Sequence, residues 1–178
     1  MLFMILLKDR SFKLLLTRHQ IRERIYELAT EIDRDYKQSE PLFLVILNGA
    51  FVFAADLLRE MSIFPEIGFI RLSSYKNTKS TGAVTELFRL HERIENRDIV
   101  IVEDIVDTGL TLQYLFNMLR KEGANSWEIV SLLSRATNPV GKLKIKYLGF
   151  DIPDKFVVGY GLDYAGFGRN LKDIYQLV

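Results

Sequence analysis

The sequence contains no cysteine, which excludes disulfide bonds and thiolate metal sites and suits a reducing cytoplasm. Its 24 Lys and Arg residues almost balance its 23 Asp and Glu residues, so the net charge is +1. That balance provides no excess positive charge for binding nucleic acid or an anionic membrane surface. The apolar runs are too short to cross a bilayer, and residues 1–7 lack the basic region and cleavage site of a signal peptide. We therefore expect a cytoplasmic protein with no nucleic-acid or membrane partner.

Two common nucleotide motifs are also absent. No glycine is followed by Lys-Ser or Lys-Thr at P-loop spacing, and Gly159-Tyr160-Gly161 does not continue as G-x-G-x-x-G. The composition is 48% hydrophobic over 178 residues, which is enough for one folded domain spanning residues 1–178.

Apolar runs alternate with helical spacing along the chain, which predicts an α/β fold with a mostly parallel sheet flanked by helices. Strands are expected at 41–47, 67–72, 84–90, 99–102, 127–133, 147–150 and 156–160, while 1–7 and 11–16 are either short strands or an N-terminal arm. Three helices are expected, the first capped by Thr17, the second at 51–61 and the third ending before Gly123. The helix residues predicted to face the core are Ile21, Ile25, Leu28, Ile32, Phe51, Ala54, Ala55, Leu58, Leu112, Leu115, Phe116 and Leu119.

The stretch from Ile99 to Leu112 organises the chain. An apolar strand at 99–102 is followed at once by Glu103 and Asp104, and a third acid stands at Asp107. The run then continues as Thr108, Gly109, Leu110 and Thr111 into a helix. Hydroxyls and N–H groups at a helix start bind phosphate, but neighbouring acids repel it unless a metal or a ligand hydroxyl lies between. The residues alone thus indicate a phosphate ligand with a metal, or solvated loop acids beside a helix cap.

Other polar segments follow the remaining strands. Asn48-Gly49 forms a turn after 41–47, and residues 73–82 form a polar loop that is either a passive surface loop or a lid over substrate. Because ligands of parallel sheets bind at the carboxyl ends of the strands, we expect Asn48, Ser73, Glu103 and Ser134 along one edge.

Residues 100–111 closely resemble the phosphoribosyl-pyrophosphate (PRPP) motif of type I phosphoribosyltransferases: an apolar strand, two acids, two apolar residues, then Asp-Thr-Gly-x-Thr. Three further segments, 47–50, 74–82 and 152–169, narrow the resemblance to the hypoxanthine-guanine phosphoribosyltransferases. The four segments occur in the family's order, and the resemblance extends from about Thr17 to the end of the chain.

The resemblance implies the type I phosphoribosyltransferase fold, with a core at about 17–150 and a small hood from about 1–16 and 151–178. It also implies a purine-salvage enzyme that transfers the 5-phosphoribosyl group of PRPP to hypoxanthine or guanine, giving IMP or GMP and pyrophosphate. The implied cofactor is Mg2+, and the implied assembly is a homodimer or homotetramer.

The resemblance also implies roles for individual residues. Asp107 would be the catalytic acid/base near purine N7. The residues implied to bind the ribose and its 5-phosphate are Glu103, Asp104, Asp107, Thr108, Gly109, Leu110 and Thr111. Those implied to bind pyrophosphate are Asn48, Gly49, Ser74, Tyr75 and Arg169. Those implied at the purine are Arg135, Phe156, Val157 and Asp163. Magnesium would be held by Asp163, and by Glu103 and Asp104 mainly through waters or ribose hydroxyls. The peptide bond before Asn48 would be cis.

Two positions depart from the family pattern. Arg135 stands where relatives commonly have a lysine that donates to the purine 6-oxo oxygen, and arginine is larger and planar. Asn48 stands where some relatives have a lysine. Two alternatives therefore stay open: a transferase that prefers another base such as xanthine, and a PRPP-fold regulator that binds RNA through Lys142, Lys144 and Lys146.

Overall fold

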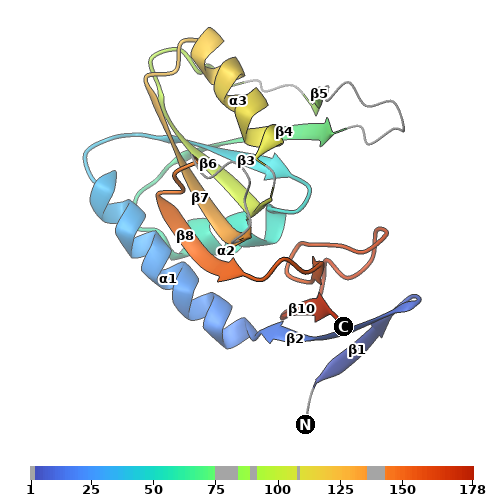
Figure 1. The fold of residues 1–178 in the computed structure, drawn as a ribbon. Coiled ribbons are helices and arrows are strands. Elements are labelled where there is room, and N and C mark those ends of the chain that lie inside the picture. The colour runs from blue at the N-terminus through green and yellow to red at the C-terminus, as the bar shows by residue number, and fades with distance from the viewer. Residues whose placement is uncertain (1–2, 75–83, 89–91, 108, 136–142) are drawn as a thin grey trace.

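A computed structural model describes residues 3–74, 84–88, 92–107, 109–135 and 143–178, with the backbone alone at 73–74 and 84–88. Its larger sheet has six strands in the order β5-β4-β3-β6-β7-β8 (Figure 1). These strands are β3 (Leu42–Leu47), β4 (Glu66–Ser74), β5 (Val84–Phe88), β6 (Asp98–Val106), β7 (Ser126–Arg135) and β8 (Tyr147–Ile152). All neighbouring pairs are parallel except β4 and β5, so the predicted α/β class with a mostly parallel sheet is confirmed.

The central strands are apolar throughout because both faces of the sheet are covered. In β3, Phe43 and Val45 face one core, while Leu42 and Leu44 face the other. The first core lies under helices α1 (Arg18–Asp35) and α2 (Phe51–Glu60), and the second lies under α3 (Leu110–Lys121). Strands buried on both sides read as continuous apolar runs, which is why sequence pattern located them.

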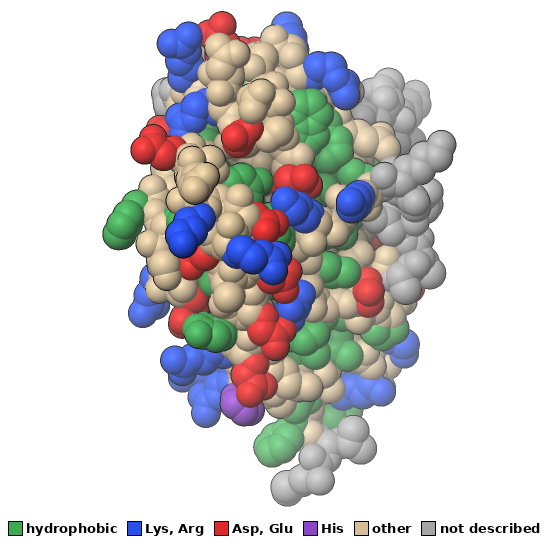
Figure 2. All heavy atoms as spheres, turned by 90° about the vertical axis from the view of Figure 1, so that its left-hand side faces the viewer, with side chains coloured by type: hydrophobic (Ala, Val, Ile, Leu, Met, Phe, Trp, Pro, Cys, Tyr) green, Lys and Arg blue, Asp and Glu red, His purple; other side chains and the backbone are tan. Residues whose placement is uncertain are grey.

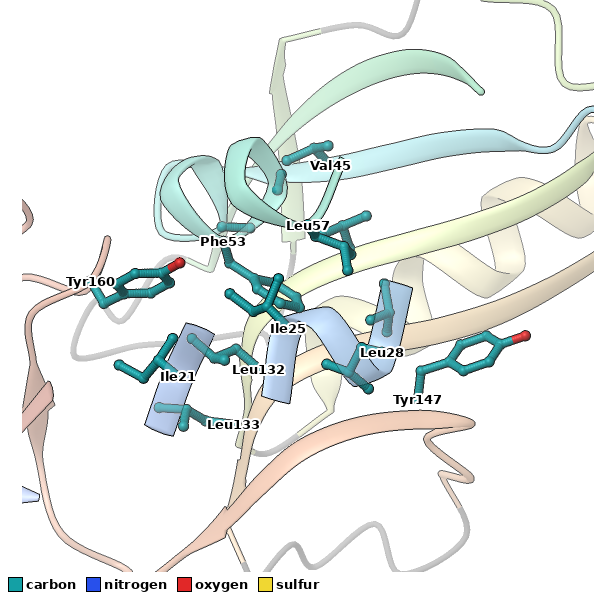
Figure 3. Close-up of a cluster of buried hydrophobic side chains, with 14 of the residues drawn as sticks. Ile21, Ile25, Leu28, Val45, Phe53, Leu57, Leu132, Leu133, Tyr147 and Tyr160 are labelled. Atoms are coloured by element: carbon teal, nitrogen blue, oxygen red, sulfur yellow. The ribbon is translucent and has the colours of Figure 1, made fainter. Parts of the chain in front are cut away.

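Helix α1 begins where the sequence predicted. The Thr17 side chain accepts from the Gln20 N–H while the Gln20 side chain accepts from the Thr17 N–H, which forms a capping box. Its predicted inner face is buried, and Figure 3 shows Ile21, Ile25 and Leu28 directed toward residues of α2 and β7.

The predicted inner face of α2 was only partly right, because Ala54 is buried as predicted but Phe51 and Ala55 are not. Phe53, Ala54 and Leu57 are buried, whereas Phe51 is 45% exposed. Ala55 is also exposed and Leu58 is only partly buried. The helix is turned because Phe53 and Leu57 fill the space between β3 and α1, as Figure 3 shows.

A second, antiparallel sheet combines both ends of the chain in the order β1-β2-β10-β9. Its strands are β1 (Met4–Leu7), β2 (Arg10–Leu16), β9 (Val157–Val158) and β10 (Ile174–Leu177). Strand β10 was not predicted, because it is only four residues long and Gln176 interrupts its apolar residues. The sheet supplies the hood of the fold class, while the bounds of core and hood as separate units stay a prediction. No helix in the described part of the chain is long and apolar enough to span a membrane.

The order of the strands indicates where the larger sheet can bind a ligand. After β3 the chain moves through α2 to β4 on one side, and after β6 it moves through α3 to β7 on the other side. The carboxyl ends of β3 and β6 therefore flank a topological switch point, where open parallel sheets bind ligands. Asn48-Gly49 follows β3 there, and Asp107 follows β6.

Candidate active site

Two buried acids lie in the last part of β6. The sequence placed Glu103 and Asp104 just beyond the strand, but β6 continues through them to Val106 because Glu103, Ile105 and Val106 all pair with β7. Neighbouring residues of a strand normally point to opposite faces, but a side-chain hydrogen bond links Glu103 and Asp104. Glu103 is 8% exposed and Asp104 is 9% exposed.

Burial raises the pKa of both carboxyls. For Glu103, desolvation is the main cause and the nearby Asp104 charge adds to it. For Asp104, desolvation raises the pKa although hydrogen bonds from Glu103 and the Ile105 N–H, together with Arg169, partly oppose it. The pair therefore favours a proton, which a bound cation would displace.

The turn after β3 packs closely against the Asp104 side chain. The Leu47–Asn48 peptide bond is cis, as the resemblance implied. A Cβ added to Gly49 would lie 1.5 Å from Asp104 Oδ2, so only glycine fits beside this carboxylate. The Gly49 backbone and the Asp104 carboxylate thus share one wall of the site.

A small cleft begins at this wall and ends at α3. It has a volume of ≈ 210 Å³ and is lined by residues of β3 and β6 together with Asp107, Gly109 and Thr111. Gly109 has φ 71 and precedes the first turn of α3. The Gln113 N–H is bonded to the Gly109 carbonyl, whereas the N–H groups before it in the first turn have no acceptor within the helix. This is the geometry of an anion site at a helix start.

A second cleft of ≈ 470 Å³ adjoins the first and shares Asp104, Ile105, Gly49 and Leu72 with it. Its other walls are Arg135 from β7, Phe156 and Val157 around β9, and Leu162, Asp163 and Arg169 from the loop that follows. Phe156 is 43% exposed, and its ring meets Tyr164 edge-on at 5.9 Å. An aromatic wall beside cationic and acidic side chains suits a flat heterocycle with polar edges.

Arg135 contacts two carboxylates that lie outside the lining of the second cleft. Its Nη1 lies 3.2 Å from Asp107 Oδ2 and 3.4 Å from Asp154 Oδ1. Asp154 belongs to the turn between β8 and β9 and was not predicted as a site residue. Its only sequence signal was its place inside the Ile152-Pro153-Asp154-Lys155-Phe156 segment.

Arg169 and Asp163 are bonded to each other. Arg169 Nη2 lies 2.6 Å from Asp163 Oδ1, and Arg169 Nη1 donates to the Gly161 carbonyl at 2.6 Å. A Cβ added to Gly161 would lie 2.2 Å from the Gly49 carbonyl oxygen, so this loop rests on the turn after β3. The loop thereby brings the Arg169 guanidinium close to the Gly49 backbone, which borders Asp104.

The acidic side chains of the two clefts suit a magnesium ion that is coordinated largely by phosphate oxygens of a ligand and by water. Among the described residues no group of three or more His, Cys, Asp or Glu side chains could hold a metal by itself. Asp163 already uses both oxygens, one toward Arg169 and the other toward the Gly166 N–H at 2.6 Å. Glu103 and Asp104 offer buried oxygens with raised pKa, and Mg2+ typically binds through one or two carboxylates plus waters and phosphate oxygens.

A larger cavity of ≈ 990 Å³ lies elsewhere, between the start of α1, α2 and residues 169–172. Arg18, Arg22 and Arg59 line it together with Asp56 and Glu60, so its charges are mixed. Its lining includes neither the buried pair Glu103 and Asp104 nor the start of α3. The two clefts at the switch point are therefore the candidate active site, and Arg169 borders both regions.

The structure brings together most of the site residues named from the sequence. Asn48 is exposed in the turn after β3, and Leu110 is 52% exposed at the start of α3. Tyr75 and Thr108 lie outside the described residues. The backbone of Ser74 ends β4 opposite Val84, and its side chain is likewise outside the described part.

Comparisons with known proteins agree on one family. The profile for the phosphoribosyl transferase domain matches residues 13–165. The hypoxanthine-guanine phosphoribosyltransferase of Bacillus subtilis is 41% identical over 95% of this chain and 94% of its own length. That of Dictyostelium discoideum is 40% identical over 94% of this chain and 96% of its own length. A crystal structure of a hypoxanthine phosphoribosyltransferase from Staphylococcus aureus superposes with a TM-score of 0.86 at 41% identity, covering 93% of this chain and 90% of the other.

Proposed function

This chain belongs to the phosphoribosyltransferase family, within its hypoxanthine-guanine branch, and we propose that the two adjoining clefts at the switch point carry out the reaction of that branch. The chain is a glycosyltransferase of purine salvage. It transfers the 5-phosphoribosyl group of PRPP to hypoxanthine or guanine, giving IMP or GMP and pyrophosphate. The observation that carries the assignment to this site is the buried acid pair of β6 directly before an anion-binding helix start.

The first cleft suits the sugar phosphate. The free N–H groups at the start of α3, with Gly109, Leu110 and the hydroxyls of Thr108 and Thr111, would hold the 5-phosphate. Glu103 and Asp104 would face the ribose hydroxyls and the waters of Mg2+. The cation and the hydroxyl donors would then take the place of the proton on this pair. Their interactions would compensate for the burial of the two carboxylates.

The pyrophosphate would lie over the turn after β3. Asn48 and Gly49 offer backbone groups there, and Arg169 lies beside them through its bond to the Gly161 carbonyl. Arg169 would turn from Asp163 to the pyrophosphate, and the released Asp163 would face the magnesium ion that this group carries. Ser74 and Tyr75 would close over the pyrophosphate and exclude water from the reacting carbon.

The purine would occupy the second cleft. Phe156 would stack on the ring, and the Val157 backbone and Asp163 would read its edge. Arg135 would donate to the 6-oxo oxygen, which accepts a cationic donor where the 6-amino group of adenine cannot. Asp107 would exchange a proton with purine N7 as N9 bonds to the sugar carbon, a role supported by its position at the first cleft and its contact with Arg135 of the second.

Magnesium would supply charge neutralisation on the pyrophosphate and the sugar hydroxyls. The chain's own residues bind and orient the two substrates and move the proton at N7. The cytoplasmic location, the homodimeric or homotetrameric assembly and the magnesium requirement stay predictions.

The RNA-binding alternative has little support from the described residues. Of its three lysines, Lys142 lies outside them, and Lys146 is 3.1 Å from Asp35. On the face shown in Figure 2, Lys and Arg side chains are interspersed with Asp and Glu, whereas an RNA-binding face is uniformly basic. Filter binding with a salt titration would detect such an activity.

The proposal is tested with purified protein, PRPP and a single base, with and without chelator. We expect IMP from hypoxanthine and GMP from guanine, and no product once Mg2+ is removed. If hypoxanthine, guanine and xanthine all give no nucleotide, the proposed function is wrong.

A further inference from the structure

Arg135 is held by two carboxylates rather than one. The same nitrogen, Nη1, lies 3.2 Å from Asp107 and 3.4 Å from Asp154. Both distances are longer than the roughly 2.7–2.9 Å of a strong charge-assisted hydrogen bond. The guanidinium therefore lies between two acids and is bonded tightly to neither.

The surroundings of Arg135 leave part of its hydrogen-bonding capacity unused. The Arg135 side chain is 18% exposed, whereas those of Asp107 and Asp154 are 51% and 60% exposed. Among the described residues its Nε is buried without a hydrogen-bond partner. An arginine placed to satisfy its own donors would not leave Nε unpaired. The Arg135 guanidinium can therefore move toward a better hydrogen-bond acceptor.

The proposed purine site supplies that acceptor. The Asp107 oxygen that accepts from Arg135 is not free to face purine N7, so this contact must open when the base binds. The 6-oxo oxygen would draw Arg135 toward the base. Asp154 is the contact that can persist during this move, because it stands in the segment that leads directly into Phe156 and Val157.

Resting on the proposed function, we propose that Asp154 is a positioning residue that retains Arg135 in the base cleft while Arg135 releases Asp107 and donates to the 6-oxo oxygen. The role depends on arginine at position 135. A guanidinium has five donors in a rigid fork and can serve two acceptors at once, whereas an ammonium is a flexible point charge.

The test compares the Michaelis constants of both substrates in Asp154→Asn and in a matched control. Asp151→Asn is the control, because Asp151 is an exposed carboxylate three residues away with no ion pair among the described residues. We expect Asp154→Asn to raise KM for hypoxanthine about fivefold, the upper range for an exposed ion pair, with kcat and KM for PRPP unchanged. Asp151→Asn should match the parent, and Asp154→Glu should recover most of the loss.

A second comparison separates positioning from a general structural effect. In an Arg135→Lys background, Asp154→Asn should raise KM for hypoxanthine no further. An equal rise in that background, an unchanged KM in the parent background, or a rise in KM for PRPP together with a lower melting temperature would each overturn the proposal.

Calorimetric binding of GMP to the same variants distinguishes this inference from the proposed function. If the parent makes no nucleotide but binds GMP, and Asp154→Asn binds it about fivefold more weakly, the function fails and the positioning role stands. If GMP binds equally to both proteins, or to neither, the positioning role is wrong.

Discussion

The two clefts of the active site are built in different ways. In the first, Glu103 and Asp104 lie inside a central strand, less than a tenth exposed, and Gly49 fits against Asp104 with no room for a methyl group. In the second, Phe156 is 43% exposed and Arg135 lies between two carboxylates that are more than half exposed. Packing fixes the sugar-phosphate cleft, whereas surface charges set the base cleft. Changes to the first should therefore impair the use of PRPP, and changes to the second should weaken binding of the base.

Asp107 lies where the two clefts meet, and its replacement should have the largest effect. Asp107→Asn keeps the size of the side chain but cannot exchange a proton with N7, so kcat should fall about 1000-fold while PRPP affinity is retained. Steady-state kinetics for both substrates provide the measurement. A variant with the parent's kcat would remove the acid/base role from Asp107.

Gly49→Ala tests whether the first cleft depends on packing. The added Cβ would overlap Asp104 Oδ2 at 1.5 Å, so the buried carboxylate or the turn must move. A displacement of that size should lower kcat/KM for PRPP about 100-fold. The control is Gly123→Ala at the end of α3, where φ is +78 and the nearest side-chain atom would be 3.5 Å from the new Cβ. It should lower stability only, and similar kinetics for the two variants would contradict the packing account.

Arg135→Gln tests the charge-based second cleft. Losing a charged donor to the 6-oxo oxygen should raise KM for hypoxanthine about 10- to 100-fold. KM for PRPP should stay near the parent value, because Arg135 does not line the first cleft. A comparable rise for both substrates would remove the distinction between the clefts.

The smallest expected effect concerns stability. Burial raises the pKa of Glu103, so the folded chain keeps a proton at pH values where the unfolded chain, near its ordinary value of 4.5, has released it. The free energy of unfolding therefore falls as pH rises from that value through the raised folded pKa. Glu103→Gln carries no such proton, and in ligand-free protein its melting temperature should exceed the parent's at about pH 8, by roughly 2–4 °C for each kcal/mol, and converge with it in acid. A lower melting temperature at that pH would show that the buried acid stabilises the fold.

The sequence predicted the first cleft better than the second. Strands β3 and β6 are buried on both faces, so each reads as a continuous apolar run in the sequence. The glycine turn and the acids that follow these runs are therefore easy to recognise from the sequence alone. The end of β6 was misplaced because the pairing of Glu103 with Ser131 in β7 is a tertiary contact that overrides the change from apolar to acidic residues. The face of α2 was partly misplaced because two core positions, Phe53 and Leu57, are chosen by the space against α1.

The second cleft could be predicted only through resemblance. Its residues come from the end of β7, the turn after β8, strand β9 and the loop to Arg169, and no local period links them. The contacts of Arg135 with Asp107 and Asp154 span 28 and 19 residues. Such charge pairs leave no pattern in a single sequence, which is why Asp154 was missed.

A competition assay tests the central claim most directly. Hypoxanthine, guanine, xanthine and adenine are supplied together with limiting PRPP and Mg2+, and the four nucleotides are separated and quantified. We predict that IMP and GMP dominate and that AMP is absent, because Arg135 donates to the 6-oxo oxygen and offers no acceptor to the 6-amino group. A product mixture rich in AMP, or no nucleotide at all, would contradict the account.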